Sequence, residues 1–545
     1  MENDYLFLKA NVVFEPLIEK WYAWPHIISP GTAAMNILKR HLEIMNSYIE
    51  DPESHVDAVK NPMMLGGPFM DFSEKNRVKE IQRLLDDTLN HQGDLIQFSL
   101  AIQKLDVILK GEPKGFSLEN VYSKVPEILK GYVELVYDLN NNVSFRLYEQ
   151  LLYKSKFYKK HTQSIALWLT DNDSRPFCLS TPKLDSEEVL FLDIPFDHEI
   201  IDKLSKMRRE GGSFSEIKAM IGSEKIKDEK LLRSFFTDEK PLPYNKYKGD
   251  KIRMRYFGHA CILIETNNLS ILIDPLISYY GYQSDVEHFS DFDLPDVIDY
   301  ILITHNHQDH ILLETLLPLR HKTKNIIVPN SGGGALQDPN LKLMFNNIGF
   351  DNVIEIGELQ NIEFIDCIIK GIPFMGEHSD LDIKSKLCYH VKIEEFSLLF
   401  VADSRVLEAK LYEHVHNEVG DVDVLFLGME CDGAPLSWLY GPLLLDTISK
   451  SNDSSRRLAG SDFKKGMHLV DIFMPSEVYV YAMGQEPWCE FISSIKYTPD
   501  SNPIIQSDFL VSECLKRGLV SERLFGEKEI LYSRITPNEE TNKIK

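Results

Sequence analysis

The pattern of hydrophobic and polar positions changes near residue 245, which predicts two parts of different architecture. Before that point, apolar residues recur at the three- and four-residue spacings of amphipathic helices. Short apolar runs at 164–169 and 189–194 predict strands among these helices. The first part is therefore predicted to be a mainly helical α+β domain, with helices over 32–49, 75–89, 120–136 and 198–207.

After residue 250 the pattern becomes that of strands. Residues 251–275 contain three β-rich runs separated by Gly and Asn-Asn turns, and later apolar runs alternate with helical stretches. Meandering strands followed by βα units predict an αββα sandwich, so the fold class of the chain is α/β (α+β). Residues 238–250 hold two prolines and six charged residues and predict the linker. We place the domains at 1–245 and 246–545.

Composition and charge limit which binding partners and which cellular compartment are expected for this chain. The chain has 545 residues, with 59 Lys and Arg against 83 Asp and Glu, for a formal net charge of −24. Such an acidic chain is not expected to bind nucleic acid or an anionic membrane surface. The N-terminus lacks a secretory signal pattern, and no run of 18 uncharged apolar residues occurs. The seven scattered cysteines indicate reduced thiols and a cytoplasmic location.

The histidines point to metal chemistry. Three of the 17 fall within six positions, in the segment THNHQDH that contains His305, His307, Asp309 and His310. On a loop leaving a buried strand, positions i and i+2 can face one centre while i+4 and i+5 face a second. Neutral imidazole and carboxylate suit zinc, iron and manganese, so the segment predicts a two-metal site. The alternative is a polar strand-end loop that happens to be rich in histidine.

This segment resembles the HxHxDH signature of the metallo-β-lactamase fold. Residues 256–278, which include Asp274, are similar to the opening strands of that family, and 294–318 are similar to its strand-to-helix signature. The resemblance covers roughly 250–500 and implies an αββα catalytic domain. It also implies that Asp403 is a bridging carboxylate. It assigns His468 to the second metal, together with Asp309, His310 and Asp403.

The third ligand of the first metal departs from the hydrolases of this fold. Where they carry a Gly-His-Ser segment, this chain reads FMGEHSDLD, so Glu377 and His378 are adjacent candidates. Neighbours on an extended segment point to opposite sides, so we expect only one of them to reach the metal. A carboxylate there favours higher oxidation states, which iron can use and zinc cannot.

One subgroup of the fold is similar to the whole chain: the di-iron β-hydroxylases known from chloramphenicol biosynthesis, which carry a long N-terminal domain. Their ligating glutamate corresponds to Glu377. The resemblance implies O₂-dependent hydroxylation of the β-carbon of an aminoacyl thioester on a peptidyl carrier domain of a nonribosomal peptide synthetase. It implies a monooxygenase with two oxo- or hydroxo-bridged iron ions, O₂ as co-substrate, an external electron donor or reductase, and a homodimer whose N-terminal domain docks the carrier. The implied metal ligands are His305, His307, Asp309, His310, Glu377, Asp403 and His468.

Two other functions compete with this one. A di-zinc hydrolase of the same fold would act on a lactone, a phosphodiester or a thioester, and a degenerate fold would serve only as a binding scaffold. His259 is either a residue beside the metals or a core histidine, and Trp438 and Tyr440 either wall a substrate channel or pack in the core. No nucleotide-type cofactor site is predicted. An acidic carrier would require a basic face near the site, which the sequence does not locate.

Overall fold

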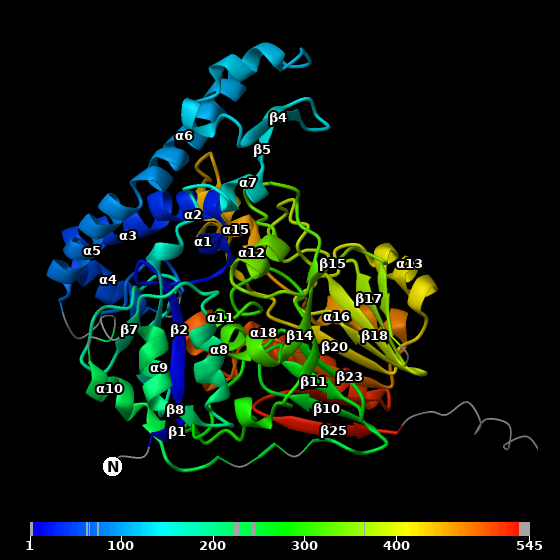
Figure 1. Cartoon of the computed structure of the whole chain (residues 1–545). Coiled ribbons are helices and arrows are strands. Elements are labelled where there is room, and N and C mark those ends of the chain that lie inside the picture. The colour runs from blue at the N-terminus through cyan, green and yellow to red at the C-terminus, as the bar shows by residue number, and fades with distance from the viewer. Residues whose placement is uncertain are drawn as a thin grey trace, which may run out of the picture.

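A computed structural model of the chain describes residues 4–533, except 62, 63, 65, 73–75, 223–225, 227, 242, 245 and 365. Figure 1 shows two large sheets packed face to face, with the N-terminal elements against one side of this sandwich. Among the described residues, no helix is both long and apolar enough to cross a lipid bilayer.

The first sheet of the sandwich has seven strands. In spatial order they are β15 (Val353–Ile356), β14 (Thr323–Pro329), β13 (Ile298–Leu302), β12 (Ser270–Ile273), β11 (Ile262–Glu265), β10 (Ile252–Tyr256) and β25 (Lys528–Tyr532). β10 to β12 form the antiparallel meander predicted for 251–275, and β12 to β15 run parallel. Parallel strands need crossover connections: α11 (Leu313–Leu319) lies between β13 and β14, and α12 (Leu341–Asn347) lies between β14 and β15.

The second sheet also has seven strands. They are β16 (Asn361–Glu363), β17 (Cys367–Ile372), β18 (Cys388–Ile393), β19 (Phe396–Phe400), β20 (Val424–Gly428), β23 (Glu477–Tyr481) and β24 (Val520–Arg523). Its first four strands are antiparallel, and β19, β20, β23 and β24 are parallel. The helices α13 (Ala409–Val419), α16 (Phe463–Phe473) and α18 (Asn502–Lys516) follow these strands.

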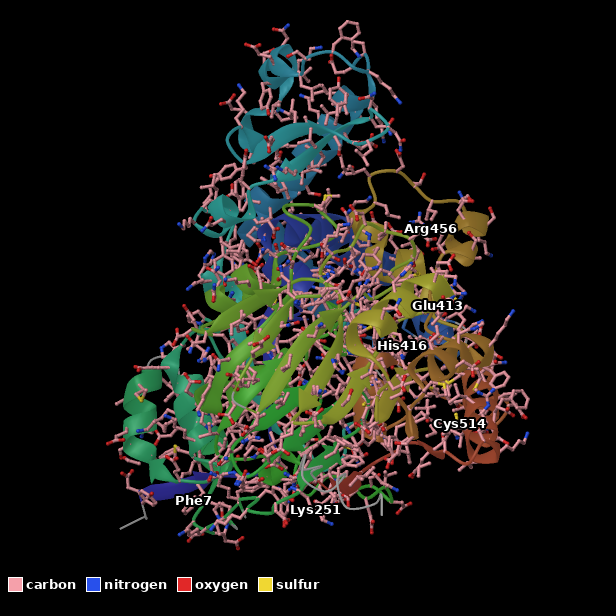
Figure 2. The ribbon with its side chains drawn as sticks, turned by 90° about the vertical axis from the view of Figure 1, so that its right-hand side faces the viewer. Phe7, Lys251, Glu413, His416, Arg456 and Cys514 are labelled. Atoms are coloured by element: carbon pink, nitrogen blue, oxygen red, sulfur yellow. The ribbon has the colours of Figure 1, made fainter. Side chains whose placement is uncertain are left out.

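Alternation along the strands builds separate cores on the two faces of each sheet. Ile262 and Ile264 of β11 belong to the core between the sheets, whereas Leu263 faces the outer core that contains α11 and α12. In the second sheet, Leu425 and Leu427 of β20 face an outer core shared with α13, α16 and α18. Figure 2 shows His416 on α13 and Cys514 on α18 on this outer side. The predicted αββα sandwich is confirmed.

The N-terminal part is a mixed α+β structure with more helix than strand, as predicted. A four-stranded sheet orders β3 (Trp21–Tyr22), β2 (Val12–Ile18), β6 (Gln163–Leu169) and β7 (Leu190–Leu192), and a three-stranded sheet orders β8 (Gly212–Ser213), β1 (Tyr5–Leu8) and β9 (Phe236–Thr237). The helices are α1 (Pro25–Ile28), α2 (Pro30–Asn36), the π-helix Ile37–His41, α3 (Leu42–Glu50), α4 (Pro52–Val59), α5 (Val78–His91), α6 (Gly93–Lys110), α7 (Glu149–Tyr153), α8 (Glu199–Lys206), α9 (Phe214–Ile221) and α10 (Glu229–Ser234). In both views, the end of α6 and the hairpin of β4 (Val133–Tyr137) and β5 (Val143–Leu147) project beyond the rest of the chain (Figures 1 and 2).

The two parts share hydrophobic cores and buried ion pairs. Phe14 and Leu167 of the N-terminal sheet pack in one core with residues of α11 and of the first large sheet. Arg175, whose side chain is 8% exposed, pairs with Glu15 and Asp173 from the N-terminal part and with Glu314 on α11. Because a buried charge is costly without its partners, moving the N-terminal part away from the sandwich would leave Arg175 and Glu314 without each other's charge.

The helix predicted over 120–136 is wrong. The segment instead forms two short 3₁₀ turns, Glu119–Lys124 and Glu127–Leu129, followed by strand β4. Pro126 accounts for the difference, because proline lacks the amide donor of a helix interior and pushes the preceding residue, Val125, into an extended conformation. The helices predicted over 32–49, 75–89 and 198–207 are present with shifted ends; Lys75 and the predicted boundary residue Asn245 lie outside the described residues.

Candidate metal centre

The candidate site lies where strands of both large sheets end. The chain leaves β12 at Asp274, β13 toward His305, β19 toward Asp403 and β23 at Ala482. Several residues at these ends have left-handed backbone: φ is 49° at His259, 40° at Asp274, 62° at Glu377, 46° at Ala402 and 53° at Ala482. Such conformations cost energy in residues other than glycine and gather at functional sites, where the surrounding structure maintains them.

Three groups of ligand atoms converge there. The first comprises His305, His307 and Glu377, and the second comprises His259, Asp309 and His310. Asp403 forms the third group with His305 and His310, one histidine from each of the other two. Within each group, the ligand atoms lie within 4.8 Å of one another. The arrangement is that of two adjacent metal positions with Asp403 between them.

Asp274 holds the histidine loop in place. This fully buried carboxylate accepts the backbone N–H of Thr304 at 2.8 Å and the Thr304 hydroxyl, and it lies 2.8 Å from Nδ1 of His310. Burial lowers the pKa of His310, but Asp274 and Asp403 outweigh burial and keep that pKa well above its ordinary value. With Nδ1 bound to Asp274, Nε2 is the His310 atom left to face a metal, 3.3 Å from Asp403.

A chain of polar contacts supports the first group. Nδ1 of His307 lies 2.9 Å from Oε1 of Glu377, and Nε2 of His307 lies 2.9 Å from the hydroxyl of Tyr440. The same hydroxyl lies 2.8 Å from Nδ1 of His378, whose Nε2 is 3.1 Å from Oε2 of Glu377. Tyr440, at the end of α14 (Leu436–Tyr440), is fully buried, so it packs in the core and also orients both imidazoles.

Our expectation for Glu377 and His378 was that only one of them reaches the metal, and among the described residues only Glu377 joins a ligand group. The expectation assumed an extended segment, but Gly376 and Glu377 both have left-handed backbone, with φ of 78° and 62°. The turn brings both side chains to the same side. Glu377 joins the ligand group of His305 and His307, whereas His378 contacts Tyr440 and the Glu377 carboxylate.

The donor set fits two metal ions of the kind that neutral imidazole and carboxylate bind. Buried side-chain atoms without a hydrogen-bond partner gather there: Nε2 of His259, His305 and His310, Oε2 of Glu377 and Oδ1 of Asp403. Buried polar atoms are rarely left unpaired, so the convergence of these atoms fits a site for positive ions. Burial lowers the pKa of His305 well below its ordinary value, which keeps its ring neutral as a metal ligand requires.

His468 does not join the other candidates. It lies on α16, whose buried residues pack on the outer face of the second sheet, away from the strand ends. His259 occupies the place beside Asp309 instead, with its Nε2 3.3 Å from Oδ2 of Asp309. The His-x-His pair His414 and His416 lies on α13, at the surface as its helical spacing predicts.

A cavity of about 370 Å³ opens onto the candidate ligands. Its walls include Arg40, from the π-helix, and Phe177 and Leu179 from the N-terminal part. Trp438 also lines it, as one of our two interpretations held. Both parts of the chain therefore build the cavity, and its other polar walls include Gln308, Glu430, Asp432 and Arg457.

Sequence reasoning missed the contribution of the N-terminal part. Nothing in the spacing of Arg40 separates it from other helical arginines, because its place depends on packing against residues 438 and 439, whose carbonyls it contacts at 2.6 and 2.9 Å. The place of His259 near the metals could be predicted from the sequence, because this residue follows the first strand of the sandwich at a glycine turn.

Comparison with known proteins adds to this geometry. Residues 7–241 match a family described as the diiron non-heme beta-hydroxylase N-terminal domain, and residues 253–434 match a beta-lactamase superfamily domain. The 4-amino-L-phenylalanyl-[CmlP-peptidyl-carrier-protein] 3-hydroxylase of Streptomyces venezuelae is 35% identical over 527 residues, which cover 95% of this chain and 98% of that protein.

Two solved structures match nearly the whole chain. The crystal structure of CmlA, a diiron β-hydroxylase from Streptomyces venezuelae, has 34% sequence identity and a TM-score of 0.90, and the match covers 97% of this chain and 100% of that one. A mutant of the same enzyme has 33% identity and a TM-score of 0.88, over 96% of this chain and 100% of that one.

Proposed function

The chain belongs to the family of diiron non-haem β-hydroxylases, and we propose that it hydroxylates the β-carbon of an aminoacyl group carried as a thioester on a peptidyl carrier domain. The observation that carries the proposal is a mixed histidine and carboxylate donor set at the base of a cavity built by both parts of the chain. The relative from Streptomyces venezuelae acts on a carrier-bound amino acid and matches nearly the whole chain.

We propose His305, His307 and Glu377 as ligands of one iron, His259, Asp309 and His310 as ligands of the other, and Asp403 as the shared carboxylate. His468 is left out of this set. Two iron ions bound there would supply the redox chemistry that activates O₂, with electrons from an external donor. The Tyr440 hydroxyl holds His307 and His378 in fixed tautomers, which keeps both rings oriented before substrate arrives.

The cavity walls suit an amino acid. Trp438 and Leu458 supply apolar surface, which excludes water from the space above the ligands. Glu430 and Asp432 lie in the same wall, where a carboxylate can pair with the substrate's ammonium group. Burial raises the pKa of Glu430 to about 7, and a bound ammonium would favour its ionised form.

Three arginines at or beside this cavity support the proposal that an acidic carrier docks here. Arg40 and Arg457 line it, and Arg456 donates from Nε and Nη2 to the Ser379 carbonyl at 2.9 and 2.6 Å, two residues beyond Glu377. None of these three guanidinium groups pairs with a carboxylate among the described residues. Figure 2 shows Arg456 in the upper half of the molecule, to the right of and below the projecting hairpin. We propose that carrier and phosphopantetheine arm approach here, and that the enzyme works as a cytoplasmic homodimer.

The proposal is tested with iron-loaded protein, a reductant and a carrier loaded with an amino acid. We expect near two irons per chain, O₂ consumption only when the loaded carrier is present, and a carrier-bound product heavier by one oxygen atom. The free amino acid serves as the matched negative substrate. Thioester cleavage by the zinc-loaded protein without O₂ would instead support the di-zinc hydrolase, which the family relationship does not favour.

A further inference from the structure

One wall of the metal cavity carries a buried positive charge. Arg40 lies on the π-helix Ile37–His41, and helix bulges of this type are frequent at functional sites. The residue is only 8% exposed. Burial lowers the pKa of its guanidinium to about 10, and no carboxylate among the described residues offsets that shift. Because a buried cation is costly without a partner, a hydrogen-bond acceptor that enters the cavity beside Arg40 would be bound favourably.

The guanidinium of Arg40 has donors that the chain itself leaves free. Its Nη2 donates to the backbone carbonyls of Trp438 and Leu439, at 2.6 and 2.9 Å, and these two bonds fix the plane of the group. Within the described part of the chain, Nε and Nη1 donate to no acceptor, yet neither is one of the fully buried unpaired atoms. Both atoms are therefore accessible, and the cavity that Arg40 lines is the space they face.

The same bonds place Arg40 beside the candidate ligands. Trp438 and Leu439 are followed directly by Tyr440, whose hydroxyl lies 2.9 Å from Nε2 of His307. The wall of the cavity therefore passes from Arg40 to the first ligand group within the short helix α14. A substrate group that Arg40 binds would be one close to the reacting carbon.

We propose that Arg40 binds the carbonyl oxygen of the aminoacyl thioester and thereby positions the β-carbon at the metal ligands. This inference rests on the proposed function, because it takes the substrate to be a thioester. Only the α-carbon then separates the carbonyl carbon from the β-carbon. A thioester has no α-carboxylate, so the carbonyl oxygen is the acceptor that every such substrate offers next to the α-carbon. The substrate's ammonium group is repelled by Arg40 and is left to Glu430 and Asp432.

Binding of two probes to the iron-loaded protein without O₂ tests the inference. One probe is the thioester phenylalanyl pantetheine, and the other is the thioether in which a CH₂ group replaces the carbonyl. A hydrogen bond from a charged donor should favour the thioester by about tenfold or more in native protein, as measured by isothermal titration calorimetry. Arg40→Gln should bind both probes with similar affinity. A residue that only shapes the cavity would change both affinities by the same factor, so their ratio isolates the carbonyl contact.

Arg457→Gln is the matched control. Arg457 lines the same cavity, and its guanidinium also donates to backbone carbonyls, those of Asp432 and Gly433. This variant should keep the preference for the thioester. Arg40→Lys is the second test variant: it keeps the buried charge on one nitrogen, which the wall carbonyls occupy, so it too should lose most of the preference.

Three results would overturn the inference: equal binding of the two probes by native protein, a preference that persists in both Arg40 variants, or an equal loss of preference in Arg457→Gln. If the loaded carrier is still hydroxylated by native protein in any of these cases, the proposed function stands without this contact. Failure of native protein to bind either probe would count against both.

Discussion

Replacing Tyr440 by phenylalanine tests whether the site depends on groups beyond its ligands. The substitution removes one oxygen atom from a fully buried ring, so packing is nearly unchanged. It deletes two contacts, 2.9 Å to Nε2 of His307 and 2.8 Å to Nδ1 of His378. His307 would then have a buried N–H without an acceptor. Its ring would keep only one of the two contacts that fix its orientation, the one to Glu377.

The expected magnitude follows from these two contacts. Leaving a buried polar atom unpaired costs about 1–3 kcal/mol, so the variant should lose a few kcal/mol of unfolding free energy. Removing the partner of a ligating histidine typically costs about 10- to 100-fold in metal affinity or activity. We therefore expect Tyr440→Phe to bind iron at least tenfold more weakly, and the metal-free protein to lose a few kcal/mol of stability.

Competition with a chelator of known iron affinity measures the first effect, and thermal unfolding of the metal-free protein measures the second. Tyr532→Phe is the matched control: that side chain is also buried and its hydroxyl donates to Glu477 at 2.9 Å, but it lies on β25 at the edge of the first sheet. The control should lose stability without losing iron affinity. The reasoning fails if Tyr440→Phe binds iron as tightly as the native protein, or if both variants lose affinity equally.

Three further predictions concern the ligands and the stability. His259→Ala should bind about one iron per chain by elemental analysis whereas His468→Ala keeps two, and the opposite pattern would restore the ligand implied by the family resemblance. Glu377→Ala should lose iron and O₂ consumption, whereas His378→Ala should keep its iron; retention of iron by Glu377→Ala would show that the carboxylate is not a ligand. Burial raises the pKa of Glu149 to about 7, so its contribution to stability is fully present below about pH 4.5 and is lost as pH rises through 7. Glu149→Gln should therefore gain stability over the native protein, by up to about 3 kcal/mol at pH 8 and less at pH 5, in urea unfolding; a difference independent of pH would contradict this assignment.

The sandwich was predictable because its signals are local. A buried strand such as β20 is a continuous apolar run, and the HxHxDH loop carries four candidate ligands within six residues. The predicted helix over 120–136 does not form, because Pro126 lies within its apolar spacing and removes an amide donor from the helix interior.

The rest of the site depends on contacts between distant segments. His259 and Asp309 are fifty residues apart and meet because β10 and β13 belong to the same sheet. The neighbours Glu377 and His378 both face the site because the backbone makes a left-handed turn there. The residue types at these two positions do not predict that turn. Arg40 reaches the cavity only through the packing of the N-terminal part on α14.

The central claim is that this chain inserts oxygen from O₂ into a carrier-bound amino acid. Its most direct test is a single turnover of the reduced, iron-loaded protein under ¹⁸O₂, with mass spectrometry of the released amino acid. Our account predicts a product that contains one ¹⁸O atom, located at the β-carbon by fragmentation. An unlabelled product, or cleavage of the thioester with no change at the β-carbon, would contradict it.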